Sequence, residues 1–259
     1  MALTSFTKFV FFYLTIRLLA DGMEEFLIQP TAWLYVRYLG ESHFFLGLLL
    51  AAFSFGAVIF TPCVGALDVR FKSPKFVFLM CSITKFIGSV FYTTPFDAYL
   101  PLIGRFLSGL GEGTVGVVYG AVTQGTNSKN RAQAFLYFEG LYTVGTACGP
   151  VIGSFFASNF NIVGLEINAG NFPGLILAAV WLMMIILTVF LPSELTRDAA
   201  ALLKTDLTNE ESESESESTP TSDTTEYSIS RICCLYFVMF QSWILLEIVL
   251  FYIPLLAAY

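Results

Sequence analysis

Charged side chains are scarce in this sequence of 259 residues. They make up 13% of it, against about 25% in an ordinary soluble domain. Hydrophobic residues make up 56%, and Phe alone occurs 27 times. Because a single soluble core cannot hide that much apolar surface, the composition argues against an ordinary soluble domain and favours a multi-span, all-α membrane protein that packs in a lipid bilayer.

Metal-binding and catalytic patterns are also lacking. The only histidine is His43, and no two of the five cysteines form a C-x-x-C pair. We therefore expect no structural zinc, no disulfide framework, no cofactor and no enzyme activity. The net charge is −7, but ten of the twenty acidic residues lie between Glu194 and Glu226. The acidity thus belongs to one hydrophilic segment, predicted to be disordered, and no basic face indicates nucleic acid.

Seven apolar runs are long enough to cross a bilayer, which takes about 20 residues per helix. We expect spans at about 8–36, 44–66, 76–94, 99–122, 132–157, 173–191 and 232–254. Residues 1–193 would form a six-span half, residues 194–231 an acidic cytosolic linker, and residues 232–259 a seventh span. Nine Lys and Arg fall on one side of this layout and only Arg37 on the other, so the N-terminus is predicted to be cytosolic. Twelve-span transporters begin in this way, and we expect the chain to be a fragment or a short isoform of one.

The first span carries charges near the bilayer midplane. Arg17, Asp21, Glu24 and Glu25 are spaced so that they share one helical face. A charge at that depth costs at least about 2.5–3.5 kcal/mol, so it must face protein or water. Arg17 and Asp21 can pair at i, i+4, which leaves the two glutamates as candidates for a proton relay or cation site. The alternative is an ion-pair network that only fixes helix packing.

Further charges lie in the third, fourth and fifth spans. Arg105 and Glu112 are seven residues apart and are expected on one face of the fourth span. Glu139 in the fifth span needs a partner as well. We predict that these residues bind the solute or exchange protons together with those of the first span. Lys85 in the third span and Glu247 in the seventh complete the list of charges within the spans. Because the long side chain of Lys85 can snorkel to the interface, Lys85 ranks below the other charges as a site residue.

Glycines recur at four-residue spacing in the same spans. Gly109 with Gly113, and Gly145 with Gly149 and Gly153, allow the backbone of a neighbouring helix to approach closely. Pro150 removes a helical hydrogen bond and can kink the fifth span. We therefore assign helix packing to these residues.

These patterns resemble the major facilitator superfamily over essentially the whole chain. The motifs that carry the resemblance are Gly65, Asp68 and Arg70 between spans two and three, Arg105, Gly109 and Gly111 in span four, and Gly145, Gly149, Pro150 and Gly153 in span five. The resemblance implies an N-terminal six-helix bundle built from two inverted three-helix repeats. It also implies a gating role for the first motif and alternating-access transport of a small solute, such as an organic anion, with or without proton coupling.

Three segments carry a narrower resemblance: Phe53-Ser54-Phe55-Gly56, Leu165-Glu166-Ile167-Asn168 and Phe240–Pro254 with Glu247. They resemble the lysosomal members of the superfamily, the group of major facilitator superfamily domain-containing protein eight, which is linked to neuronal ceroid lipofuscinosis. This resemblance implies an endosomal or lysosomal membrane. Asp198, Leu202 and Leu203 form an acidic dileucine sequence, so clathrin adaptors are candidate partners beside the lipid bilayer and the solute. Two alternatives to a coupled transporter are an anion channel or uniporter in an endolysosomal membrane, and a truncated regulatory isoform that transports nothing.

Overall fold

The computed structural model describes residues 2–71, 73–125, 128–155, 160–162 and 165–191, with a few single residues between 234 and 245. The chain forms two compact units, 1–208 and 209–259. The predicted linker 194–231, most of the seventh span 232–259 and the sorting residues Asp198, Leu202 and Leu203 lie outside the described residues. The helices and strands given below all belong to the first unit.

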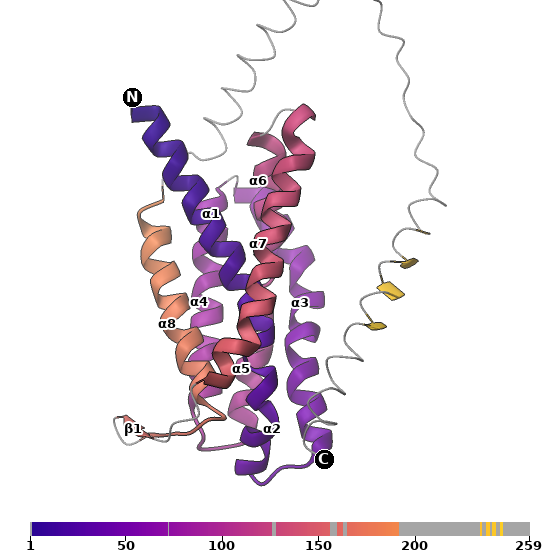
Figure 1. The fold of residues 1–259 in the computed structure, drawn as a ribbon, viewed down its shortest axis with the longest axis vertical. Coiled ribbons are helices and arrows are strands. Elements are labelled where there is room, and N and C mark those ends of the chain that lie inside the picture. The colour runs from indigo at the N-terminus through magenta and orange to yellow at the C-terminus, as the bar shows by residue number, and fades with distance from the viewer. Residues whose placement is uncertain are drawn as a thin grey trace, which may run out of the picture. The chain divides into compact units, whose positions relative to one another are not determined.

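The described part of the first unit contains eight helices and one small antiparallel hairpin (Figure 1). The elements, in chain order, are α1 (Ala2–Leu27), α2 (Gln29–Tyr38), α3 (His43–Phe71), α4 (Pro74–Thr93), α5 (Tyr99–Leu110), α6 (Thr114–Gly125), α7 (Ser128–Phe155), β1 (Phe160–Ile162), β2 (Leu165–Ile167) and α8 (Phe172–Val189). The hairpin pairs Asn161 with Glu166 at its centre. It was not expected from the sequence, where this stretch reads only as a loop.

Two of the predicted spans are each built from two helices. The first span is interrupted at Ile28, two residues before Pro30, where α1 ends and α2 begins. The fourth span is interrupted at residues 111–113, a Gly-Glu-Gly turn between α5 and α6. Proline lacks an amide hydrogen and glycine favours turns, so both breaks have a local cause. Residues on opposite sides of such a break therefore need not share one helical face.

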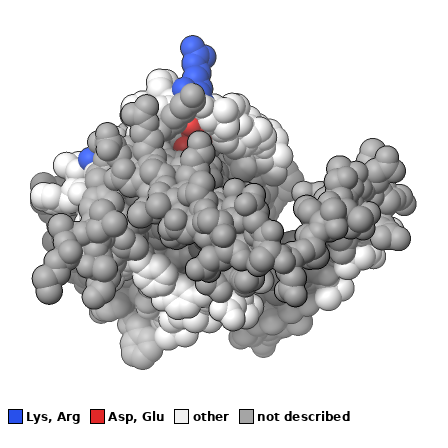
Figure 2. Space-filling model, turned by 90° about the horizontal axis from the view of Figure 1, so that it is seen from above, with Lys and Arg blue, Asp and Glu red and all other residues white. Residues whose placement is uncertain are grey.

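Three helices in the described part, α3, α4 and α8, are long and apolar enough to cross a membrane by length and composition. The others differ for identifiable reasons. α1 contains five charged residues, and α5 and α6 have only 12 residues each. Seen from above, the described part of the molecular face shows only scattered Lys, Arg, Asp and Glu (Figure 2). The buried charged residues, by contrast, lie inside the helix bundle.

The helices pair in a pattern with internal symmetry. α1 packs mainly on α7, α3 on α5, and α4 on both α5 and α8 (Figure 1). In terms of spans, the first packs on the fifth, the second on the fourth, and the third on the sixth. Exchanging the first three spans with the last three maps these three pairs onto one another, as an inverted repeat of three plus three helices requires. The further contact of the third span with the fourth has only a weak counterpart between the sixth span and the first.

Glycines bring the backbones of two helix pairs, α3 with α5 and α1 with α7, into contact. At the contact between α3 and α5, a Cβ atom on Gly109 would collide with the carbonyl oxygen of Phe53, and one on Gly56 would lie 2.5 Å from that of Phe106. At the contact between α7 and α1, Gly145, Gly149 and Gly153 all face the backbone of α1. The two crossings therefore use the same small-residue device.

The remaining predicted packing and gating residues are placed as follows. Pro150 lies inside α7 without ending that helix, and Gly113 faces Val64 of α3. Gly65, Asp68 and Arg70 lie within α3, which ends at Phe71 rather than near residue 66 as predicted. They are therefore the last turns of a helix rather than an inter-helix loop.

Candidate functional site

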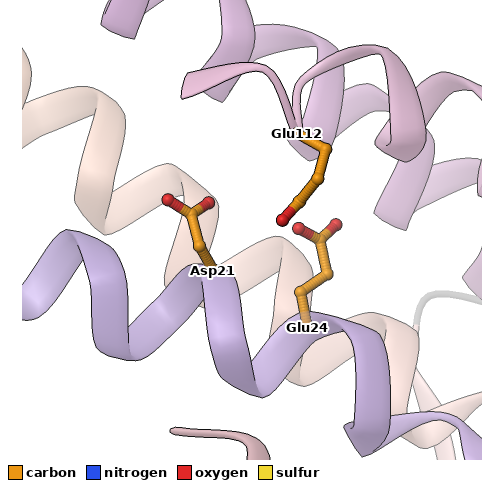
Figure 3. A group of neighbouring side chains, drawn as sticks. All are labelled: Asp21, Glu24 and Glu112. Carbon is orange, nitrogen blue, oxygen red and sulfur yellow. The ribbon is translucent and has the colours of Figure 1, made fainter. Parts of the chain in front are cut away.

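One buried lysine lies at the centre of the site. Lys85 of α4 places its Nζ 2.7 Å from Oδ1 of Asp21, 2.8 Å from Oε2 of Glu24 and 2.7 Å from Oε2 of Glu112. The two acids of α1 and Glu112 of the turn between α5 and α6 point toward one another (Figure 3). A single ammonium group thus joins the first, third and fourth spans.

Lys85 does not snorkel to the interface, although the length of its side chain would allow this. Its side chain is fully buried, and its Nζ lies 4.5 Å from the ring centre of Trp181 in α8. Three carboxylates compensate the cost of burying this charge far better than a stretch of the side chain toward water would. Gly111 contributes as well, because a Cβ there would come within 2.6 Å of Cγ of Lys85.

Arg17 completes the buried charge cluster, which we define as Arg17, Asp21, Glu24, Lys85 and Glu112. Its Nε lies 3.4 Å from Oδ2 of Asp21, so the predicted i, i+4 pair is present. Its two terminal nitrogens donate to Ser82 Oγ at 2.6 Å and to Thr114 Oγ1 at 3.3 Å. Arg17 also donates to the hydroxyl of Tyr13 and to the carbonyl of Phe78, both at 3.4 Å. It is therefore tied to five other groups and acts as a fixed counter-charge.

The buried charge cluster has one more negative than positive group. Two cations face three carboxylates, so the net charge is −1 when all five are ionised. Oε1 of Glu24 has no hydrogen-bond partner among the described residues. The Glu112 side chain is 17% exposed, whereas the other members are fully buried. The cluster can therefore accept one proton or one cation, and Glu112 is its contact with the outside.

The same three carboxylates are close enough to hold a metal ion. One oxygen from each of Asp21, Glu24 and Glu112 lies within 4.8 Å of the others (Figure 3). The Lys85 ammonium lies among these oxygens, at the ion-pair distances given above. The Lys85 ammonium thus takes the place among the three carboxylates that a bound cation would otherwise occupy.

Arg105 adjoins the cluster without joining it. It is 3% exposed, and its Cζ lies 4.3 Å from the ring centre of Phe53. Its Nε and Nη1 have no hydrogen-bond partner among the described residues. Glu112, which was expected on the same helical face as Arg105, binds Lys85 instead, because the turn at 111–113 interrupts the helix of the fourth span. The carboxylate that acts most strongly on Arg105 is Glu24.

The other two predicted acids lie apart from the cluster. The hydroxyl of Tyr142 donates to Oε2 of Glu25 at 3.4 Å. The hydroxyl of Tyr119 donates to Glu139, which is exposed. Sequence reasoning therefore named four of the five cluster members as site residues and ranked Lys85 below them. Lys85 lies at the middle of its own predicted span, so the cost of a charge at that depth indicates that Lys85, like Asp21, must face protein or water.

The multi-span helical fold, with a cluster of charges buried between its repeats, is that of an integral membrane protein. Residues 14–259 match the Major Facilitator Superfamily, and the chain belongs to this family. The fold agrees, because the structure superposes on the xylose transporter XylE from E. coli in an inward-open conformation with a TM-score of 0.70. The match covers 95% of this chain and 63% of XylE at 15% sequence identity.

Curated relatives of the chain are SPX domain-containing membrane proteins of plants. The chain is 28% identical over 167 residues to one from Oryza sativa subsp. indica, covering 63% of this chain and 23% of that protein. It is also 28% identical over 186 residues to one from Arabidopsis thaliana, covering 71% and 26%. The chain thus spans about a quarter of the length of these relatives. They do not show the narrower lysosomal group.

Proposed function

We propose that this chain is part of a proton-coupled secondary transporter that moves a small solute, an organic anion or another small metabolite, by alternating access. One observation carries the proposal. A single buried ammonium, that of Lys85, lies within 2.8 Å of three carboxylates that come from two different spans. Ionisable groups inside a membrane domain are expensive, and in transporters they mark proton relays and ion sites.

The cluster has the properties that a coupling site needs. It carries one uncompensated negative charge, and a bound proton removes that charge. Glu112 is its partly exposed member, and it lies in the turn between Gly111 and Gly113 rather than within a helix. A proton on Glu112 weakens its ion pair with Lys85, which loosens the link between the first and fourth spans. These spans belong to different repeats, so proton binding would bias how the helices pack.

Uptake measurements test the proposal. The full-length protein is reconstituted into vesicles, and uptake of lactate, succinate and xylose is followed with and without an inward proton gradient. The wild type should accumulate one of these solutes only with the gradient. Glu112→Gln should take up that solute at the same rate with and without the gradient, because the exchangeable carboxylate is gone.

The matched control is Glu139→Gln, which changes an exposed acid outside the cluster and should keep its dependence on the gradient. Gradient-driven accumulation by Glu112→Gln would contradict the proposal. A current through the wild type that follows the voltage without any dependence on the proton gradient would favour an anion channel or uniporter instead.

We also propose an endosomal or lysosomal membrane, with a cytosolic N-terminus. The support is the acidic dileucine sequence Asp198, Leu202 and Leu203 together with the distribution of basic residues. Replacing both leucines by alanine should move a fluorescently tagged full-length protein from endolysosomal vesicles to the cell surface. An unchanged distribution of the tagged variant would speak against sorting through this sequence.

A further inference from the structure

The guanidinium of Arg105 is a buried cation with unused hydrogen-bonding capacity. It is 3% exposed, and two of its nitrogens, Nε and Nη1, have no hydrogen-bond partner among the described residues. Arg17, its counterpart in α1, is by contrast held by Asp21, Ser82 and Thr114. Leaving a buried charge without hydrogen bonds is unfavourable, so this arrangement suits a residue that awaits a ligand.

We propose that Arg105 is the anion-binding subsite, that it takes a carboxylate or phosphate oxyanion, and that binding of this anion is coupled to proton binding by the buried charge cluster. The inference rests on the proposed function and assigns the substrate class for that same site. The planar guanidinium fork matches the oxygens of carboxylate and phosphate groups, and such charge-assisted hydrogen bonds are strong.

The surroundings of Arg105 hold it ready for such a ligand. The ring of Phe53, itself buried, lies beneath Cζ at 4.3 Å. An aromatic ring stabilises the cation by a cation–π interaction and leaves the nitrogen edges free for hydrogen bonds. The carboxylate that acts most strongly on Arg105 is that of Glu24, whose Oε1 also has no hydrogen-bond partner among the described residues. Arg105 and Glu24 thus attract each other without being bonded.

Charge balance couples the anion to a proton. With Arg105 included, three cations face the three carboxylates of the cluster, and Glu25, which also acts on Arg105, adds a fourth carboxylate. A bound anion adds one more negative charge to the site, and one proton on the cluster offsets it. The charged groups that act on Glu24 are Asp21 of its own helix, Lys85 of α4, Arg105 of α5, and Glu112 of the turn between α5 and α6; from α7, the hydroxyl of Tyr142 contacts the neighbouring Glu25.

Equilibrium binding tests the inference without any need for transport. The purified full-length protein is titrated with lactate at pH 5.5 and pH 7.5, since the charge of this carboxylate is constant over that range. Phosphate at pH 7.5 distinguishes the two oxyanion classes, and chloride is the non-oxyanion control. We expect one oxyanion to bind and chloride not to compete with it. If lactate is the ligand, its Kd should be at least about fivefold lower at pH 5.5 than at pH 7.5, which is within the usual range of coupling between two sites.

Two variants give opposite results. Arg105→Gln should lose oxyanion binding while its ligand-free melting temperature falls only slightly, because Nε and Nη1 have no hydrogen bond to lose although the cation–π contact with Phe53 is removed. Glu24→Gln should bind lactate or phosphate tightly at pH 7.5, because one carboxylate fewer leaves the site without need of a proton. Glu139→Gln should behave as the wild type.

Three results would overturn the inference: that neither oxyanion binds, that Arg105→Gln binds as well as the wild type, or that Glu24→Gln binds no more tightly than the wild type at pH 7.5. Failure here and failure of the proposed function are distinguishable. Proton-driven xylose uptake without oxyanion binding would overturn only the inference. Oxyanion binding with no gradient-driven uptake of any solute would overturn only the proposed coupling.

Discussion

Replacing Lys85 by Met should destabilise the protein by about 3–5 kcal/mol, the usual cost of removing one partner of a buried ion pair. The variant keeps the length of the side chain but leaves Asp21, Glu24 and Glu112 facing one another without their shared cation. Unfolding of the full-length protein in mixed detergent micelles measures this difference. Lys75→Met is the control. Lys75 is on the same helix but only half-buried, with Nζ donating to the carbonyl of Val189, and its replacement should cost only about 1–2 kcal/mol, the usual contribution of such a hydrogen bond.

The cause of that loss can be separated from a loss of packing. Adding Glu112→Gln to Lys85→Met removes one of the unpaired carboxylates and should restore part of the stability, although it is a second change in the same core. Acidification should also narrow the gap between Lys85→Met and the wild type, because protonation neutralises the remaining acids. If Lys85→Met were as stable as Lys75→Met, the buried charge cluster described here would be wrong.

Gly109→Ala and Gly116→Ala should change stability in opposite directions. A Cβ on Gly109 would collide with the carbonyl oxygen of Phe53, so α5 must move away from α3, at a cost of about 1–3 kcal/mol for overpacking. Gly116 lies in α6 with nothing within 4 Å of its Cβ position. Alanine there should stabilise the helix by up to about 1 kcal/mol. The same unfolding assay compares the two variants.

Gly109→Ala and Gly116→Ala should differ in their effect on transport as they differ in their effect on stability. The crossing of α3 and α5 fixes α5, which carries Arg105 and leads into the turn with Glu112. Gly109→Ala should therefore lower gradient-driven uptake, and Gly116→Ala should leave it within twofold of the wild type. Equal stability of both variants would contradict the close approach of the two helices.

The sequence predicts those features of this protein that depend on local spacing. Composition and run length predict the multi-span helical class, which the fold and the family confirm. The i, i+4 spacing predicts the pair of Arg17 and Asp21, which is present at 3.4 Å. Four-residue spacing predicts that Gly145, Gly149 and Gly153 share a face, and all three do face α1. In each case the relevant partners are set by the geometry of one helix.

Features that depend on contacts between distant helices were not predictable in this way. Lys85 and Asp21 are 64 residues apart in the sequence, and nothing in the pattern of α4 says which helix its lysine meets. A single lysine in an apolar span is also compatible with snorkelling. Glu112 was assigned to the face of Arg105 because an unbroken helix was assumed, and the turn at 111–113 sends it to Lys85 instead. Long-range pairing and helix breaks are tertiary effects, which periodicity alone does not encode.

Solute-dependent proton movement tests the central claim most directly. Vesicles that contain the full-length protein and an internal pH dye are mixed with lactate, with the membrane potential clamped at zero. The account predicts that lactate acidifies the interior of wild-type vesicles and that neither Glu112→Gln nor Arg105→Gln does so, while Glu139→Gln behaves as the wild type. Lactate entry without any change in internal pH, or full acidification by Glu112→Gln, would contradict the assignment of proton coupling to the buried charge cluster.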